Sequence, residues 1–263
     1  MAIVNVTPDS FADGGERVDP DVAIADAIRM VDDGADILDI GGESTRPGAE
    51  PLPADEELRR VSPVLEGLRG RVQVPVSIDT YKAEVAGRAL DLGATIVNDV
   101  SALTYDGELA GLVAERRAAV VLMHNRGRSA RMYADARYED VAAEVAAELS
   151  ARVRAAEAAG IARERIIVDP GLGFAKKAEH TWAALARLDE LCALGCPILT
   201  GPSRKSFLTL GSGNVPPAGR VWGTAAAVAA SILLGAHVVR VHDVREMVQV
   251  ARAADAILAA RAC

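Results

Sequence analysis

The stretch V-P-V-S-I-D-T-Y-K-A-E-V-A-G-R-A-L-D-L-G-A-T-I-V-N, residues 74–98, decides the fold. It begins and ends with short runs rich in Val and Ile, residues 74–78 and 95–98, which are typical of buried strands. A longer run of helical period, rich in Ala, Leu, Arg and Glu, separates them. Gly93 stands between that run and the second strand, where a left-handed helix cap is expected. The stretch therefore predicts a strand–helix–strand unit with parallel strands.

This unit recurs along the whole chain, so that eight strands alternate with helical runs. The predicted strands cover residues 3–6, 37–40, 74–78, 95–98, 119–123, 165–168, 197–200 and 237–241. Asp19 and Pro20 precede the first helix as an N-cap and a first-turn residue. Glycines mark five of the eight returns from helix to strand, as left-handed caps would: Gly34, Gly93, Gly160, Gly195 and Gly235.

Eight near-equal units predict an α/β fold, a single (β/α)8 TIM barrel that spans residues 1–263. No linker or low-complexity tract divides the chain, and segments 41–53 and 211–219 look like long loops that follow strands. The alternative is an open doubly wound sheet. Its usual G-x-G-x-x-G fingerprint is missing after the first strand, which favours the barrel.

Composition restricts the partners of the chain. Its net charge is −8 and aromatic residues make up 3%, which argues against nucleic acid and anionic membranes. No apolar run approaches the roughly 18 residues of a membrane span, and the start lacks a signal peptide, so we expect a soluble cytoplasmic protein. Three cysteines without paired spacing, Cys192, Cys196 and Cys263, predict neither disulfides nor a zinc site.

Polar residues end nearly every predicted strand. They are Asn5, Asp39, Asp79, Asn98, His124, Asp169, Ser203 to Lys205, Arg240 and His242. One such residue is explained as well by capping of the following helix. Eight strand ends together favour a functional site, because the carboxyl ends of barrel strands meet on one catalytic face.

The first subset of these residues suits a heterocycle. Asp79, Asn98, Asp169 and Lys205 combine hydrogen-bond acceptors and an amide with one mobile cation. A carboxylate can accept two parallel N–H bonds and would hold an aminopyrimidinone ring in one orientation. Taken singly, Asp79 and Asp169 are as readily interpreted as turn or helix caps.

A second and a third subset suggest two further ligands. Arg side chains with glycines and a neutral amide suit a diphosphate and a hydrated Mg²⁺, and this set is Asn5, Thr45, Arg46, Arg240 and His242. Surface ion pairs are the alternative for the arginines. The motif S-R-K-S at 203–206, with Gly171, Gly173 and Phe174, could line a slot for a flatter substrate. No nucleophile elbow or H-E-x-x-H motif occurs, which favours stabilisation of a leaving group.

Eight motifs, in order along the chain, closely resemble those of the dihydropteroate synthases. They are N-V-T-P-D-S-F-A-D-G-G from residue 5, G-G-E-S-T-R-P-G-A from 41, S-I-D-T from 77, N-D-V-S from 98, L-M-H from 122, D-P-G-L-G-F from 169, S-R-K-S-F-L from 203 and R-V-H-D from 240. The resemblance implies a barrel enzyme of folate biosynthesis. It would join 6-hydroxymethyl-7,8-dihydropterin diphosphate to p-aminobenzoate, giving 7,8-dihydropteroate and pyrophosphate.

The resemblance also implies roles for individual residues. Those at the pterin would be Asp79, Asn98, Met123, Asp169 and Lys205. Those at the diphosphate would be Asn5, which would also help bind Mg²⁺, with Thr45, Arg46, Arg240 and His242. Those bordering p-aminobenzoate would be Thr45, Pro47, Phe174, Ser203 and Lys205. Lys205, Asp79, Asp169 and Arg240 would be the catalytic set, and Asp9, Phe11 and Asp13 would order the closing first loop.

The implied chemistry is loss of diphosphate from the pterin methylene, followed by attack of the arylamine. The absence of an insertion in G-L-G-F-A-K-K, residues 171–177, predicts sensitivity to sulfonamides, which mimic p-aminobenzoate. Relatives usually carry a segment before the first strand, so we expect a less covered barrel floor or a truncated start. Asn125, where many relatives have another residue, would alter packing beside the pterin.

Two other functions stay open at this stage. A methyltransferase acting on methyltetrahydrofolate would share the pterin residues but would not need the diphosphate motifs. A catalytically silent pterin-binding paralogue should have eroded loop motifs, whereas these are complete. For quaternary structure, the family suggests a homodimer through the run 224–234 and the last helix, although core burial is the favoured explanation of that run.

Overall fold

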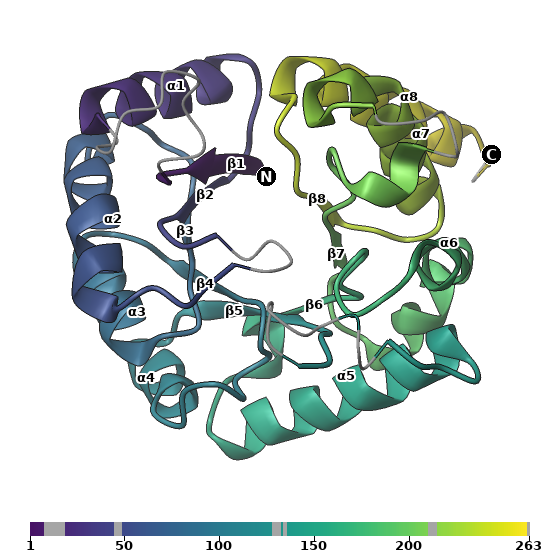
Figure 1. Ribbon diagram of the computed structural model, residues 1–263, viewed down its shortest axis with the longest axis horizontal. Coiled ribbons are helices and arrows are strands. Elements are labelled where there is room, and N and C mark those ends of the chain that lie inside the picture. The colour runs from purple at the N-terminus through teal and green to yellow at the C-terminus, as the bar shows by residue number, and fades with distance from the viewer. Residues whose placement is uncertain (8–18, 45–48, 128–132, 134–135, 210–214, 262–263) are drawn as a thin grey trace.

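The computed structural model describes residues 1–7, 19–44, 49–127, 133, 136–209 and 215–261. Over these residues strands and helices alternate, and the helices form a ring around the strands (Figure 1). The strands are β1 Ala2–Asn5, β2 Leu38–Gly41, β3 Val76–Asp79, β4 Ile96–Asp99, β5 Ala119–Met123, β6 Ile166–Asp169, β7 Leu199–Thr200 and β8 Val238–Val239. The helices are α1 Pro20–Asp32, α2 Ala54–Leu68, α3 Ala83–Asp91, α4 Leu109–Arg116, α5 Val141–Ala158, α6 Ala178–Ala186, α7 Val221–Leu233 and α8 Val244–Arg261.

The strands close into a barrel. Strands β1 to β6 pair in parallel in sequence order, and β7 pairs in parallel with β8. Bridges between Val168 and Ile198 and between Ala2 and Val241 join the two sets. The second junction is held by the N–H of Ile3, which donates to the carbonyl of Val241 at 3.0 Å. The predicted TIM barrel is therefore confirmed, with strand bounds shifted by a few residues.

The helix ends follow the predicted local signals. All five glycines expected at the returns have positive φ, between +63° and +106°, a conformation that costs glycine little. Asp19 caps α1 by accepting a hydrogen bond from the N–H of Asp21, and Pro20 occupies the first turn. The register of the repeating units is thus set by residues outside the strands. Among the described helices, none is long and apolar enough to cross a membrane.

The inside of the barrel has an apolar floor. Met1, Ile96, Val121 and Leu199 form a buried cluster, against which further strand residues pack, namely Ile37, Ala119, Ile167 and Val238. Side chains two residues apart on a strand point to the same face. The next inward positions above this floor are therefore Asp39, Asn98, Met123, Asp169 and Arg240. The fold itself raises these polar side chains to the carboxyl-end mouth of the barrel.

Candidate active site

Neighbouring strands place polar side chains at one level of the mouth. Asn5 is in register with Gly41, Gly41 with Asp79, and Asp79 with Asn98. A Cβ atom on Gly41 would lie 3.4 Å from the Cβ of Asp79, so the glycine keeps the space beside this carboxylate open. On the other side of the mouth, Met123 is in register with Asp169. The sequence-predicted pterin set is thus distributed over adjacent strands.

A single guanidinium, from the residue after β8, joins β2 and β3 at the mouth. Arg240 donates from Nε to Oδ2 of Asp39 at 2.6 Å and from Nη2 to Oδ2 of Asp79 at 2.7 Å. Asn98 donates from Nδ2 to the same Asp39 oxygen at 3.0 Å. Burial opposes the charge of Arg240, but attraction to Asp39 and Asp79 raises its pKa above the ordinary value. Two carboxylates therefore hold this arginine as a permanent cation.

Burial disfavours the ionised form of the carboxyl groups of Asp79 and Asp169, near Arg240. Burial raises the pKa of Asp79 to about 7, against the attraction of Arg240. The pKa of Asp169 is also raised by burial, although the N–H of Gly171 donates to its Oδ1 at 2.7 Å. Both groups gain from a ligand that brings N–H donors, because such donors would replace lost solvation. The mouth is built to accept hydrogen bonds from a ring edge.

Lys205 lies at the boundary between the two predicted organic subsites. Its Nζ donates to the carbonyl of Leu172 and lies 4.1 Å from the centroid of the Phe174 ring. Burial lowers the pKa of Lys205 to about 8, against the attraction of Asp169. The ammonium thus faces an aromatic wall on one side and the carboxylate of Asp169 on the other. This position fits contact with two ligands at once.

The predicted diphosphate and arylamine sets also meet across the loops after β7 and β8. The Oγ of Ser203 lies 2.9 Å from Nδ1 of His242, and the backbone N–H of His242 donates to the same oxygen at 3.1 Å. Since that oxygen already accepts from the backbone, its own proton is available for Nδ1. Outside this pair, Arg204 is tied to Asp243, with Nε 3.0 Å from Oδ2. The S-R-K-S and R-V-H-D motifs therefore form one structural unit.

Comparisons with known proteins agree with this geometry. The sequence model of the family described as "Pterin binding enzyme" matches residues 1–242. The chain belongs to this family.

Close relatives within the pterin-binding family are dihydropteroate synthases. The synthase of Synechocystis is 47% identical over 257 residues, which cover 98% of this chain and 89% of the relative. That of Mycobacterium leprae is 49% identical and covers 98% and 93%. Among crystal structures, the Xanthomonas albilineans enzyme with 4-aminobenzoic acid superposes with a TM-score of 0.92 at 46% identity, covering 98% of this chain and 92% of that one.

Six predicted residues of this family member lie outside the described residues: Asp9, Phe11, Asp13, Thr45, Arg46 and Pro47. The described part of the second loop ends next to three of them. There Glu43 accepts hydrogen bonds from Tyr81, at 2.9 Å, and from Lys82, which also contacts the buried Glu57. The start of this loop is therefore anchored to the loop that follows β3.

Asp39 is the mouth residue to which the motifs assign no role. It is completely buried, and its Oδ1 has no hydrogen-bond partner among the described residues. Its position on an inward face between Ile37 and Gly41 was visible in the strand pattern. A carboxylate within an otherwise apolar strand indicates a buried partner, because a buried carboxylate requires a cation or a hydrogen-bond donor. Arg240 meets that requirement from the far end of the chain.

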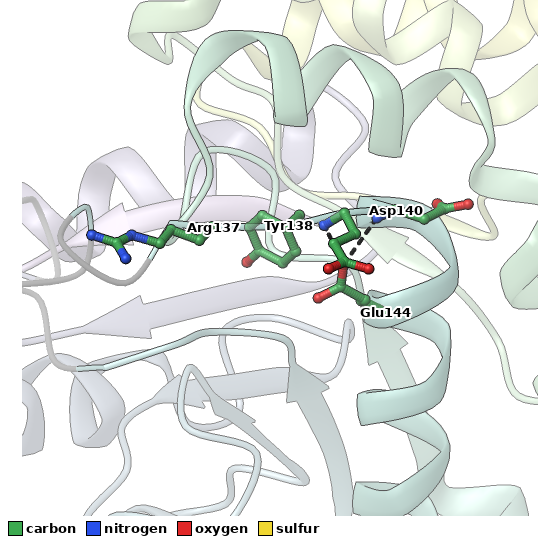
Figure 2. Close-up of a pocket in the computed structure, with 5 residues that line it drawn as sticks. Arg137, Tyr138, Asp140 and Glu144 are labelled. Carbon is green, nitrogen blue, oxygen red and sulfur yellow. Dashed lines mark hydrogen bonds between the residues drawn. The ribbon is translucent and has the colours of Figure 1, made fainter.

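A hollow in the described part of the chain lies away from the mouth of the barrel. It has a volume of about 510 Å³ and is lined by Arg137, Tyr138, Glu139, Asp140 and Glu144, at the start of α5 (Figure 2). The carboxylate of Glu144 turns back to accept from the N–H groups of Glu139 and Asp140, at 2.7 and 3.0 Å. These contacts close the N-terminus of the helix. None of the predicted substrate residues lines this hollow.

Proposed function

We propose that this chain condenses 6-hydroxymethyl-7,8-dihydropterin diphosphate with p-aminobenzoate, giving 7,8-dihydropteroate and pyrophosphate. The observation that carries the proposal is the mouth cluster, in which Arg240 and Asn98 link Asp39 and Asp79 beside Asp169 and Lys205. Relatives support the same reaction. The Clostridium difficile synthase, solved in the presence of pteroic acid, matches with a TM-score of 0.91 at 45% identity, covering 98% of this chain and 95% of that one.

The pterin would lie over the apolar floor with its polar edge toward the carboxylates. Asp79 and Asp169 would accept from its amino and ring N–H groups, and Asn98 can both donate and accept. Lys205, with a pKa of about 8, is mostly protonated at neutral pH and would donate to a ring acceptor. Met123, which is 4% exposed, would pack beside the ring. These contacts fix the exocyclic methylene toward the loops that follow β7 and β8.

The diphosphate would lie toward Asn5, His242 and Arg240, with Thr45 and Arg46 from the second loop. Two nitrogens of Arg240 bind carboxylates, and its Nη1 makes no hydrogen bond to the described residues, so it can reach an oxyanion. The pterin and diphosphate sets thus share this arginine. Its fixed charge would stabilise the leaving group as the C–O bond lengthens.

Mg²⁺ fits this rim as a substrate-held ion. The described residues contain no cluster of three His, Cys, Asp or Glu side chains that could hold a metal, whereas Asn5 offers one neutral amide oxygen at the end of β1. Mg²⁺ characteristically keeps several waters and binds through few protein ligands plus phosphate oxygens. When bound, the ion would neutralise charge on the departing diphosphate.

In the reaction, the bond between the pterin methylene and diphosphate oxygen breaks, and pyrophosphate leaves with the electron pair. The electron-rich reduced pterin stabilises the resulting cation. The arylamine nitrogen then forms the C–N bond and loses one proton to solvent or pyrophosphate. Phe174, Ser203 and Lys205 would border the arylamine, together with Thr45 and Pro47. Asp9, Phe11 and Asp13 would close the first loop and exclude water that would hydrolyse the cation.

The same site would bind sulfonamides in place of p-aminobenzoate. We further propose a cytoplasmic homodimer formed through α7 and α8. One face of α7 is buried in the core through Thr224, Ala227, Val228, Ser231 and Ile232. Trp222, in contrast, is 82% exposed near the start of α7, and Ile257 on α8 is 49% exposed, so both remain available for a partner. Sedimentation at a single monomer mass would contradict the dimer.

The decisive assay incubates the purified chain with the pterin diphosphate, Mg²⁺ and p-aminobenzoate, and follows pyrophosphate and dihydropteroate. We expect one pyrophosphate per dihydropteroate. Lys205→Ala should lower kcat/KM by about a hundredfold or more, because it removes the cation shared by the two subsites. Wild-type turnover no higher than that of Lys205→Ala would refute the proposed reaction.

A further inference from the structure

The loop that follows β6 is held by side chains at every peptide carbonyl from residue 171 to residue 175. Lys176 Nζ donates to the carbonyls of Gly171 and Phe174, at 3.2 and 3.1 Å. The remaining three carbonyls accept from Lys205 at Leu172, from the Tyr133 hydroxyl at Gly173 and from the Tyr138 hydroxyl at Ala175. Surface loops usually leave such groups to water. Here the protein itself fixes the backbone on which Phe174 stands.

Lys176 is the central group of this arrangement. Its side chain is buried, with the residue 1% exposed, and Nζ has a third acceptor in Nδ1 of His124 at 2.8 Å. An ammonium has three N–H donors, and these three neutral acceptors use all of them. The far side of the His124 ring continues the chain of contacts, because Nε2 lies 3.0 Å from Oε2 of Glu148 on α5. Lys176 therefore links the loop to β5 and α5.

The hydrogen bonds of Lys176 hold the turn that orients Phe174. The N–H of Phe174 donates to the carbonyl of Gly171 at 2.9 Å, and Lys176 binds both this carbonyl and that of Phe174 itself. Gly171 packs directly against the backbone of His124, since a Cβ at Gly171 would lie 2.0 Å from the carbonyl oxygen of His124. With the turn fixed, the Phe174 ring lies beside Lys205 Nζ.

We propose that Lys176 is a positioning residue for the arylamine subsite, acting through the backbone of residues 171–175 to hold Phe174 against Lys205. The inference rests on the proposed function. Lys176 does not touch the reacting atoms, and Asp79, Asn98 and Arg240 stand on other strands. Its removal should therefore impair binding of the arylamine much more than binding of the pterin diphosphate.

The test replaces Lys176 by Met, whose unbranched side chain is one heavy atom shorter and lacks the N–H donors. Lys177→Met is the matched control, because Lys177 is the next residue in the chain and is exposed. We expect the KM for p-aminobenzoate to rise about tenfold in Lys176→Met, the loss expected for a misplaced aromatic contact. The KM for the pterin diphosphate should change less than about twofold. The control should match the wild type in both.

A second measurement separates positioning from loss of fold. Hydrogen exchange should accelerate in the peptide that covers residues 171–175 in Lys176→Met, and not in Lys177→Met. Tyr138→Phe, which removes only the hydroxyl bound to Ala175, should raise the KM for p-aminobenzoate in the same direction but less. Equal arylamine KM values in both lysine variants, or a parallel rise in both substrate KM values, would overturn the positioning role. Absence of product from the wild type would instead overturn the proposed reaction.

Discussion

Two buried cations at the mouth of this barrel are held in opposite ways. Arg240 lies between the carboxylates of Asp39 and Asp79, at 2.6 and 2.7 Å. Lys176, which is 1% exposed where the Arg240 side chain is 20% exposed, donates to two carbonyls and an imidazole, all neutral acceptors. The carboxylates raise the pKa of Arg240, whereas burial lowers the pKa of Lys176 to about 7. Both groups donate hydrogen bonds, but only counter-charges keep a shielded cation charged at every pH.

The contrast matches the work that each group would do. Arg240 would meet an anionic leaving group and needs a charge that does not vary. Lys176 meets two backbone carbonyls and the His124 imidazole, so it supplies hydrogen-bond donors to neutral groups. A lysine can lose its proton under burial, and an arginine effectively cannot. The residue type therefore fits the electrostatic demand at each place.

Replacement of Arg240 by Met should have the largest effect. It leaves Asp39 and Asp79 buried without their cation, so we expect a loss of about 3–5 kcal/mol in unfolding free energy at neutral pH. The kcat/KM should fall at least about a hundredfold. Denaturant unfolding measures the loss in unfolding free energy, and steady-state kinetics measures the fall in kcat/KM. Arg245→Met, on the exposed side of α8, is the control.

The pH dependence of this variant has a definite sign. Without Arg240 the folded-state pKa of Asp79, already about 7, rises further above its ordinary value of 3.8. A carboxyl with a raised folded pKa contributes stability that is present at low pH and lost as pH rises through that pKa. Arg240→Met should therefore be more stable near pH 5 than near pH 8, relative to the wild type. A constant difference across this range would show that the carboxylates do not depend on Arg240.

Lys176→Met should change the alkaline side of the stability curve. The pKa of Lys176 is about 7 in the folded state and has an ordinary value of 10.5. Between these pH values the unfolded chain binds more protons, so Lys176 makes wild-type stability rise with pH there. The variant should lose that rise, on the order of 3 kcal/mol from pH 7 to pH 10. Charged or titratable groups that act on Lys176 and remain in the variant are Asp169, Lys205, Glu148, Arg126 and His124.

The measurement is denaturant unfolding of the wild type, Lys176→Met and Lys177→Met at several pH values between about 7 and 10. Because the other titrating groups are common to all three proteins, their contributions cancel in the differences to a first approximation. Parallel stability curves for the two variants would show that Lys176 stays charged throughout, like Arg240, and would remove the contrast between the two cations.

Glu148→Gln should have the smallest effect, because it changes only the outer end of the Lys176 contacts. A hydrogen bond from His124, with others from Arg126, lowers the pKa of Glu148 to about 2. Its side chain is 43% exposed, so solvent screening limits the loss to less than about 1 kcal/mol at neutral pH. A depressed carboxyl pKa contributes stability above about pH 4.5 that is lost toward pH 2.

For Glu148→Gln, unfolding at pH 7 and pH 3 is the measurement, and the difference from wild type should shrink at the lower pH. Glu157→Gln is the control, since the carboxylate of Glu157 pairs with Arg163 on the surface, at 2.9 Å. A loss as large as that of Arg240→Met would mean that the outer carboxylate, rather than the three acceptors of Lys176, organises the loop.

Much of the barrel could be predicted because its signals are local. Val and Ile runs, helical periods and cap glycines each act within a few residues, and all eight predicted strands form within a few residues of their expected bounds. The residues at the mouth could also be predicted, because the carboxyl ends of the strands converge in a barrel regardless of loop conformation. The ligand roles predicted for the individual site residues all stay predictions, and so does the extent of the single domain over residues 1–263.

Asp39 and Lys176 show where sequence reasoning stopped. Asp39 was recognised as a polar strand end, but its partner Arg240 is 201 residues away, and no local pattern connects them. Lys176 and Lys177 are identical neighbours, yet one is buried under the loop and the other is exposed. Both outcomes depend on which distant groups the closed barrel brings within hydrogen-bond distance.

The sequence by itself determined the order and kind of the elements, the polar rim and the family, since periodicity and motifs are properties of neighbouring residues. Only the tertiary structure decided which side chains form ion pairs at the mouth and which ones bind the loop that follows β6. Arg240 becomes common to two predicted ligand sets, and Lys176 becomes the support of Phe174. The physical reason is that burial and counter-charge are set by the whole fold, and these two quantities decide whether a buried cation keeps its proton.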